Sequence, residues 1–78
     1  TGTSAKTRYQ MTLVIEIERE EDGRWIAEVP SLPGVLAYGA TETEARAKAQ
    51  ALALRVLADR LEHDEADPDL MNISFSAV

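Results

Sequence analysis

Two carboxylates, Glu16 and Glu18, stand two residues apart in an alternating apolar segment. This spacing puts both side chains on one face of a β-strand. Paired carboxylates on a sheet are what a nuclease uses when two Mg²⁺ ions clamp a phosphodiester. Such a site also needs a carboxylate from the last strand, where the same face offers only Asn72, Ser74 and Ser76. The constellation is incomplete, so a metal-dependent nuclease remnant is the weakest function that we consider.

Other residue types that carry out chemistry are isolated in the sequence. His63 is the only histidine, and it falls at the end of the expected helix, where a protonated imidazole interacts favourably with the helix dipole. Ser31 has no activating base at a known spacing, and the glycines do not form a phosphate-binding pattern. The absence of cysteine excludes disulfides and thiolate metal sites. We therefore expect a protein that is not an enzyme, with no catalytic residue, no metal and no cofactor.

Protein binding is a better use of the strand carboxylates. One face of the expected sheet would stay uncovered, and its expected partner-binding residues are Val14, Glu16, Glu18, Arg24, Ile26, Glu28 and Tyr38, with Leu36 beside Tyr38. Apolar centres ringed by carboxylates suit an interface with a basic partner. The same face, or an edge such as the third strand, would alternatively serve a homodimer or a higher homo-oligomer. The sequence leaves both uses open.

The first two elements form an expected hairpin. Residues Thr12 to Arg19 alternate between apolar and polar side chains, which predicts a half-buried strand. Asp22 and Gly23 then give a tight-turn signal, because glycine accepts a positive φ. The segment from Arg24 to Val29 predicts the antiparallel second strand, in which Trp25 would be the aromatic anchor of the core.

A turn-rich stretch leads to the third strand. Pro30 has no N–H to give to a ladder and should end the second strand. Pro33 and Gly34 suit the two central positions of a type II turn. A short strand is expected from Val35 to Gly39, and Gly39 then leads the chain out of the sheet.

A long helix follows, from Glu42 to about His63. Thr41 and Glu44 have the spacing of a capping box, in which the threonine side chain accepts from a first-turn N–H and the glutamate reaches back. The expected buried stripe is Ala45, Ala49, Leu52, Ala53, Val56, Leu57 and Leu61. Beyond an acidic loop, residues 70–78 alternate again, which predicts the fourth strand.

The pattern predicts an α+β fold with the order β-β-β-α-β. The four-stranded mixed sheet should have the order 3-2-1-4, with the fourth strand parallel to the first and one long helix on one face. A chain of 78 residues is enough for a single domain. We assign that domain to residues 11–78 and expect residues 1–10 to be a flexible arm or an expression-tag remnant.

The composition limits the possible binding partners and the cellular compartment of the protein. Asp and Glu total 14 against 8 Lys and Arg, a formal charge of −6. This field repels phosphate backbones, so we expect no direct nucleic-acid binding. No apolar run has the roughly 20 residues that span a bilayer, and the N-terminus lacks a signal-peptide pattern. We expect a soluble, acidic cytoplasmic protein with no membrane contact.

The order of these motifs resembles the HicB-like antitoxin family. The resemblance covers residues 12–62 and rests on D-G, A-E-V-P, L-P-G, a strand-ending glycine and T-x-x-E-A. In this chain the motif residues are Asp22, Gly23, Pro30, Leu32, Pro33, Gly34, Gly39, Thr41 and Glu44. The resemblance implies a partial ribonuclease-H-like fold. It also implies the antitoxin role in a type II toxin-antitoxin system, in which the protein binds a small basic HicA-like toxin and blocks its cleavage of mRNA.

Two departures from the family leave an alternative open. Family members commonly carry a C-terminal ribbon-helix-helix or helix-turn-helix segment for DNA, and this sequence includes none, so we expect a stand-alone domain with no supported DNA role. The polar residues that usually follow L-P-G are replaced by Val35, Leu36 and Ala37. The alternative is an orphan HicB-like module, structural or regulatory, that forms homo-oligomers and has no toxin partner.

Overall fold

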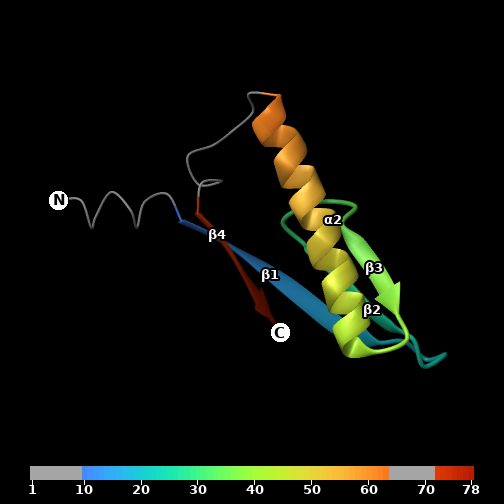
Figure 1. Cartoon of the computed structure of the whole chain (residues 1–78). Coiled ribbons are helices and arrows are strands. Elements are labelled where there is room, and N and C mark those ends of the chain that lie inside the picture. The colour runs from blue at the N-terminus through green and yellow to red at the C-terminus, as the bar shows by residue number, and fades with distance from the viewer. Residues whose placement is uncertain (1–9, 64–71) are drawn as a thin grey trace.

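A computed structural model describes residues 10–63 and 72–78 of the chain, and its elements follow the order β-β-β-α-β (Figure 1). Their bounds are β1 Gln10–Arg19, β2 Trp25–Glu28, β3 Leu36–Gly39, α2 Glu42–Glu62 and β4 Asn72–Ala77. The strands form one sheet in the order β3-β2-β1-β4. β1 is antiparallel to β2 and parallel to β4, so the predicted α+β fold, with its 3-2-1-4 order, is confirmed.

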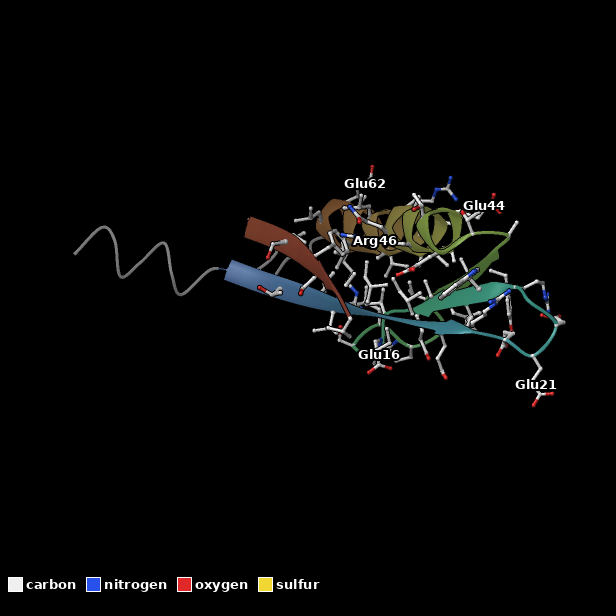
Figure 2. All side chains as sticks on the ribbon, turned by 90° about the horizontal axis from the view of Figure 1, so that it is seen from below. Glu16, Glu21, Glu44, Arg46 and Glu62 are labelled. Atoms are coloured by element: carbon white, nitrogen blue, oxygen red, sulfur yellow. The ribbon has the colours of Figure 1, made fainter. Side chains whose placement is uncertain are left out.

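The sheet and the helix form two layers (Figure 2). Within the sheet, the long strand β1 has different neighbours along its length. It pairs with β4 over its first part, from Gln10 to Ile15, and with β2 over its second part, from Glu16 to Arg19. The helix packs chiefly on β3 and β2, and the β1 residues that are buried in the core, Leu13 and Ile15, lie in the first part of this strand.

The hairpin between β1 and β2 closes through a three-residue loop. The N–H of Gly23 donates to the carbonyl of Glu20 at 3.0 Å, and the N–H of Glu20 donates to the carbonyl of Arg24 at 2.7 Å. Gly23 has φ of 91°, a conformation that an L side chain rarely adopts. The predicted hairpin is confirmed, and its three-residue loop ends in a glycine with a positive φ, which is common in hairpin loops of this length.

The connection from β2 to β3 contains the predicted type II turn. The N–H of Val35 donates to the carbonyl of Leu32 at 3.0 Å, with Pro33 and Gly34 between them, and Gly34 has φ of 86°. These are the positions that proline and glycine favour in this turn. The N–H of Val29 donates to Val35 at 3.0 Å, so the loop is closed at its base.

The helix begins where the sequence predicts. Thr41 is the N-cap, and its Oγ1 accepts from the N–H of Glu44 at 3.1 Å. The Glu44 carboxylate reaches back to the N–H of Ala40 at 3.2 Å, one residue before the cap. Gly39 does more than end a strand: a Cβ on it would lie 2.5 Å from the backbone nitrogen of Ala45. Only glycine lets the first turn of α2 sit so close to β3.

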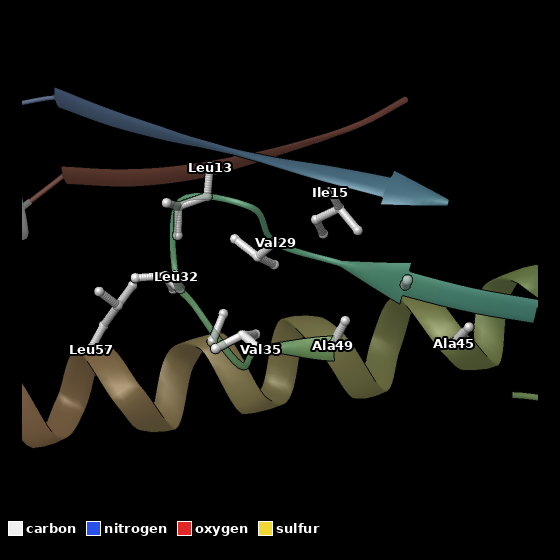
Figure 3. Close-up of a cluster of buried hydrophobic side chains, with 10 residues drawn as sticks. Leu13, Ile15, Val29, Leu32, Val35, Ala45, Ala49 and Leu57 are labelled. Atoms are coloured by element: carbon white, nitrogen blue, oxygen red, sulfur yellow. The ribbon is translucent and has the colours of Figure 1, made fainter. Parts of the chain in front are cut away.

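The core fills the space between the sheet and the helix (Figure 3). Its buried residues are Leu13, Ile15, Ala27, Val29, Leu32, Val35, Ala45, Ala49, Ala53 and Leu57. Small alanines line the first half of the buried stripe of α2, which lets this helix approach the sheet closely.

Two expectations about the core were wrong in degree. Trp25 is only half-buried, and the guanidinium of Arg19 lies 5.9 Å from the centre of its ring. Leu61 is 40% exposed, because the last turn of α2 extends beyond the described strands.

The element boundaries differ from the predicted ones by a few residues. β1 begins at Gln10, not Thr12, because Gln10 is in register with Asn72, and backbone pairing needs no apolar side chain. β2 and β3 are shorter than predicted, since the chain leaves the ladder for the turns at Pro30 and Gly34. The expected arm was residues 1–10, and its last residue, Gln10, belongs to β1 instead. Residues 1–9, the acidic loop and the start of the last strand at residues 70–71 lie outside the described residues. No helix in the described part of the chain is long and apolar enough to cross a membrane.

Candidate protein-binding face

The side of the sheet that faces away from α2 is not covered by any described element, and we call it the open face. Its residues alternate along each strand with the buried core positions, as strand geometry requires. The residues of the open face are Thr12, Val14, Glu16, Glu18, Ile26, Glu28, Leu36, Tyr38, Ser74 and Ser76. Of the seven residues that the sequence assigned to partner binding, six lie here, and Arg24 lies at the margin, beyond the end of β2.

Large apolar side chains on the open face are exposed. Val14, Leu36 and Tyr38 are 42%, 40% and 39% exposed. Ile26 is half-buried and is the direct neighbour of Tyr38 across β2 and β3. These side chains spread an apolar area over three strands, which is the composition of an interface centre.

Three carboxylates gather beside this apolar area. Glu16 and Glu28 are direct partners in the register of β1 and β2, and Glu18 follows Glu16 on the same face, opposite Ile26. Direct cross-strand partners have Cβ atoms about 4.5–5.5 Å apart, and like charges in that position are unfavourable. Across residues 10–63 and 72–78, none of the three carboxylates has an ion-pair partner; the ion pairs present are Asp22 with Arg24, Glu44 with Lys48, and Asp59 with His63. Figure 2 shows Glu16 on the sheet side of the molecule, opposite Glu62 on the helix.

Among the described residues, Arg24 brings a cation close to this face, and its charge already pairs with the Asp22 carboxylate. Its guanidinium lies 4.5 Å from the centre of the Tyr38 ring. Its Nε donates to Asp22 at 2.8 Å, and its backbone N–H donates to the same carboxylate at 3.0 Å. The hydrogen bond from this backbone N–H, followed by the one from the guanidinium, lowers the pKa of Asp22. Arg24 is therefore held at the hairpin end, away from the Glu16 and Glu28 pair.

A hollow of about 220 Å³ lies among the carboxylates. It is lined by Glu16, Ile17, Glu18, Ile26, Glu28 and Val78. Val78 is placed there by backbone pairing, because its N–H donates to Ile15 at 2.9 Å and its carbonyl accepts from Ile17 at 3.0 Å. The hollow thus combines apolar walls with carboxylates on one side of the sheet.

The residues considered for nuclease or metal chemistry occupy ordinary positions. Ser74 on β4 is hydrogen-bonded to Thr12 on β1 at 3.1 Å between the two hydroxyl oxygens. His63 is the C-cap of α2, with Nδ1 2.7 Å from the carbonyl oxygen of Asp59, as predicted for a residue at the helix end. In the part of the chain that the structure describes, no three His, Cys, Asp or Glu side chains are arranged to hold a metal ion.

The opposed pair of Glu16 and Glu28 is the feature that the sequence interpretation missed. Both residues were assigned to the same face, but their direct opposition depends on the length of the hairpin loop. Because the loop has three residues, Glu20 pairs with Arg24, and further from the loop along the two strands Glu16 pairs with Glu28. A two-residue loop of Asp22 and Gly23 would have paired Glu16 with Val29 instead. The available signal was therefore the loop length, which the D-G motif alone leaves undecided.

Comparisons of the chain with protein-family models, with curated proteins and with solved structures gave no match. The likeness to HicB-like antitoxins consequently rests on the sequence motifs.

Proposed function

We propose that this chain is a HicB-like domain that acts as an antitoxin, binding a small, basic, mRNA-cleaving HicA-like toxin through the open face. The observation that carries the proposal is the opposed pair Glu16 and Glu28, without a described cation, beside the exposed side chains of Val14, Leu36 and Tyr38. A partner surface that combines basic and apolar side chains matches both the carboxylates and the exposed apolar side chains of this face.

The opposed glutamates favour a partner that supplies positive charge. Their mutual repulsion costs the free protein about 0.5 kcal/mol at an exposed sheet position. A Lys or Arg side chain placed between them would remove this repulsion and add attraction. Charge complementarity of this kind increases the association rate and excludes acidic partners. The apolar side chains then contribute the burial that holds the complex together.

Inhibition by this route needs no catalytic group in the antitoxin. An enzyme that cleaves mRNA binds a polyanion, so its RNA-binding surface is basic. The carboxylates of the open face would occupy that basic surface in place of RNA phosphates. The domain body would at the same time block access to the catalytic residue of the toxin.

The direct test uses a HicA-like toxin encoded by a short basic reading frame next to that of this protein. The two purified proteins are mixed at increasing ratios, and the cleavage of an mRNA substrate is measured. We expect cleavage to stop near stoichiometric amounts and the two proteins to co-purify. Unchanged cleavage in the presence of excess protein would overturn the antitoxin role and favour the orphan module.

A pair of variants tests the face itself. Glu16→Lys should weaken toxin binding by tenfold or more, roughly the 1.4 kcal/mol expected from one well-placed charge pair. Glu62→Lys changes the net charge equally but lies on the helix, on the other side of the molecule (Figure 2), and should have little effect. The affinity should also fall as salt is raised, because the attraction is screened. Equal effects of the two variants would exclude the open face as the binding site.

A further inference from the structure

The outer edge of β3 has backbone groups without a partner among residues 10–63 and 72–78, and their positions follow from the sheet register. β3 is an edge strand, with β2 on its inner side only (Figure 1). The N–H of Val29 donates to the carbonyl of Val35, which fixes the alternation of the antiparallel ladder. Ala37 is the register partner of Ala27, so its backbone groups point toward β2. The N–H and C=O groups of Leu36 and Tyr38 therefore point outward, away from the sheet.

Apart from the shortness of the strand, the described residues of this edge show none of the devices that usually prevent strand pairing. Lysine, proline and bulges are common on protected edges. The strand Leu36–Gly39 has the sequence LAYG, with no charge and no proline. Leu36 and Tyr38 are also among the most exposed large apolar residues of the described chain. The edge thus offers both backbone hydrogen bonds and an apolar surface to another strand.

We propose that β3 pairs with β3 of a second copy of this chain, in antiparallel orientation about a two-fold axis at Ala37. In this register Leu36 lies opposite Tyr38 of the second copy, and each such pair exchanges both N–H···O=C bonds. If the axis lay at Leu36, Tyr38 would pair with Gly34 of the second copy, and if it lay at Tyr38, Leu36 would pair with Ala40 of that copy. Gly34 and Ala40 both lie outside the four-residue strand. The axis at Ala37 therefore makes the most hydrogen bonds.

Charge complementarity supports a second copy as the occupant. Arg24 stacks on Tyr38 near one end of β3, whereas Glu28 is the register partner of Leu36 near the other end. The two-fold axis brings opposite ends together, so Tyr38 with its stacked Arg24 lies beside Leu36 of the second copy, and Glu28 of that copy lies one strand further, about 10 Å from Tyr38 between backbones. The cation at the margin of one open face thus approaches a carboxylate of the other, and symmetry repeats the contact.

The helices fit this arrangement. α2 packs chiefly on β3 and β2 of its own chain. With strands about 4.8 Å apart, two such helices across a shared β3 edge would lie about 10 Å from each other. This is the usual distance between packed helices, about 8–10 Å. The dimer would therefore have one continuous eight-stranded sheet, with both helices on one side and both open faces on the other.

The oligomeric state in solution is the first test. Sedimentation of the full chain over about 1 µM to 1 mM should show a species of twice the chain mass of 8.6 kDa that dissociates on dilution. A mass of 8.6 kDa across the whole range would overturn the proposal. The experiment needs no toxin, so its outcome is independent of the antitoxin role.

Two matched variants distinguish the β3 edge from the rest of the open face. Tyr38→Glu and Val14→Glu each add one negative charge at a position of similar exposure, 39% and 42%. Tyr38→Glu should raise the dimer dissociation constant at least about tenfold, and Val14→Glu should change it less than about threefold. Equal weakening by both variants would show that the copies meet through the face and not the edge.

Amide hydrogen exchange provides a readout that needs no substitution. In the dimer, the N–H groups of Leu36 and Tyr38 are hydrogen-bonded and should exchange slowly, and their exchange should accelerate on dilution. If these two amides exchange rapidly in a species with the mass of a dimer, the copies pair elsewhere and the proposal fails.

Discussion

Replacing Gly39 by alanine tests whether the close contact between β3 and α2 holds the two layers in place. A Cβ at this position would lie 2.5 Å from the nitrogen of Ala45 and 3.0 Å from its Cα. An ordinary contact begins near 3.4 Å, so the strand and the helix would have to separate by about 0.9 Å. The atoms that obstruct are backbone atoms of a capped first turn, and no side-chain rotation can relieve the clash.

The expected loss of stability follows from this geometry. Overpacking that shifts backbone costs about 3 kcal/mol at the upper end of the usual range. The better conformational entropy of alanine in a strand returns about 0.5–1 kcal/mol. The net destabilisation of Gly39→Ala should be about 2 kcal/mol, which lowers the Tm of a domain of this size by about 8–16 °C. Thermal and urea unfolding, followed by circular dichroism and by Trp25 fluorescence, measure both quantities.

Gly34 supplies the matched control, because it is needed for a different reason. A Cβ on Gly34 would meet nothing within 4 Å, but its φ of +86° disfavours alanine by about 1–2 kcal/mol. Asparagine tolerates this conformation, so Gly34→Asn should be milder than Gly34→Ala, whereas Gly39→Asn should be at least as damaging as Gly39→Ala. A free energy of unfolding of Gly39→Ala within about 0.5 kcal/mol of the wild type, the range of a neutral surface substitution, would show that the close contact between β3 and α2 does not hold the layers in place.

Four further predictions concern the core, the helix start and the open face. Leu57→Ala should lower the free energy of unfolding by about 2–5 kcal/mol in urea titrations, because Leu57 is only 1% exposed and fills the end of the core. Thr41→Ala should cost about 1 kcal/mol in the same assay, since it removes the N-cap acceptor for Glu44. The hydrogen bond from the Ala40 N–H, and then the contact with Lys48, lowers the pKa of Glu44. The stability that this carboxylate contributes is therefore present above its unfolded pKa of 4.5 and is lost as pH falls through the lower folded value. Glu44→Gln should flatten that part of a plot of unfolding free energy against pH. Glu28→Lys should stabilise the free protein by about 0.5 kcal/mol in thermal unfolding, because it replaces the repulsion with Glu16 by attraction.

The capping and pH predictions have matched controls at the start of the helix, and the other two have outcomes that would contradict them. Thr43→Ala changes an exposed threonine two residues beyond the cap and should be nearly neutral; equal losses at the two threonines would exclude capping as the cause. Glu42→Gln removes a first-turn carboxylate without a described partner and should leave more of the pH dependence than Glu44→Gln. A core variant Leu57→Ala as stable as the wild type would show that the buried cluster is not formed. A Glu28→Lys protein less stable than the wild type would show that the opposed glutamates do not repel.

Local sequence signals determined most of the fold. The alternation in β1, the D-G turn, the P-G turn and the T-x-x-E cap each act over a few residues, and the structure has all four where they were predicted. The short connections then left few arrangements of the sheet, and the 3-2-1-4 order followed. Element ends were less well predicted, because Gln10 joins a strand through its backbone register with Asn72, a residue far along the chain.

The candidate site shows the limit of the same signals. Alternation placed Glu16, Glu28 and Tyr38 on one face, and that was correct. Their neighbours across the strands depend on register, and one more residue in a hairpin loop moves every partner by one position. The local sequence pattern therefore could not predict that Glu16 lies opposite Glu28 or that Arg24 stacks on Tyr38.

The sequence by itself determined which residues turn the chain, which start the helix and which side of each strand is polar, because these properties depend on the backbone preferences and periodicity of neighbouring residues. Only the tertiary structure decided which charges stand opposite each other and why Gly39 must be a glycine. The first property depends on the register that the length of the hairpin loop sets between β1 and β2, and the second depends on the close packing of α2 against β3.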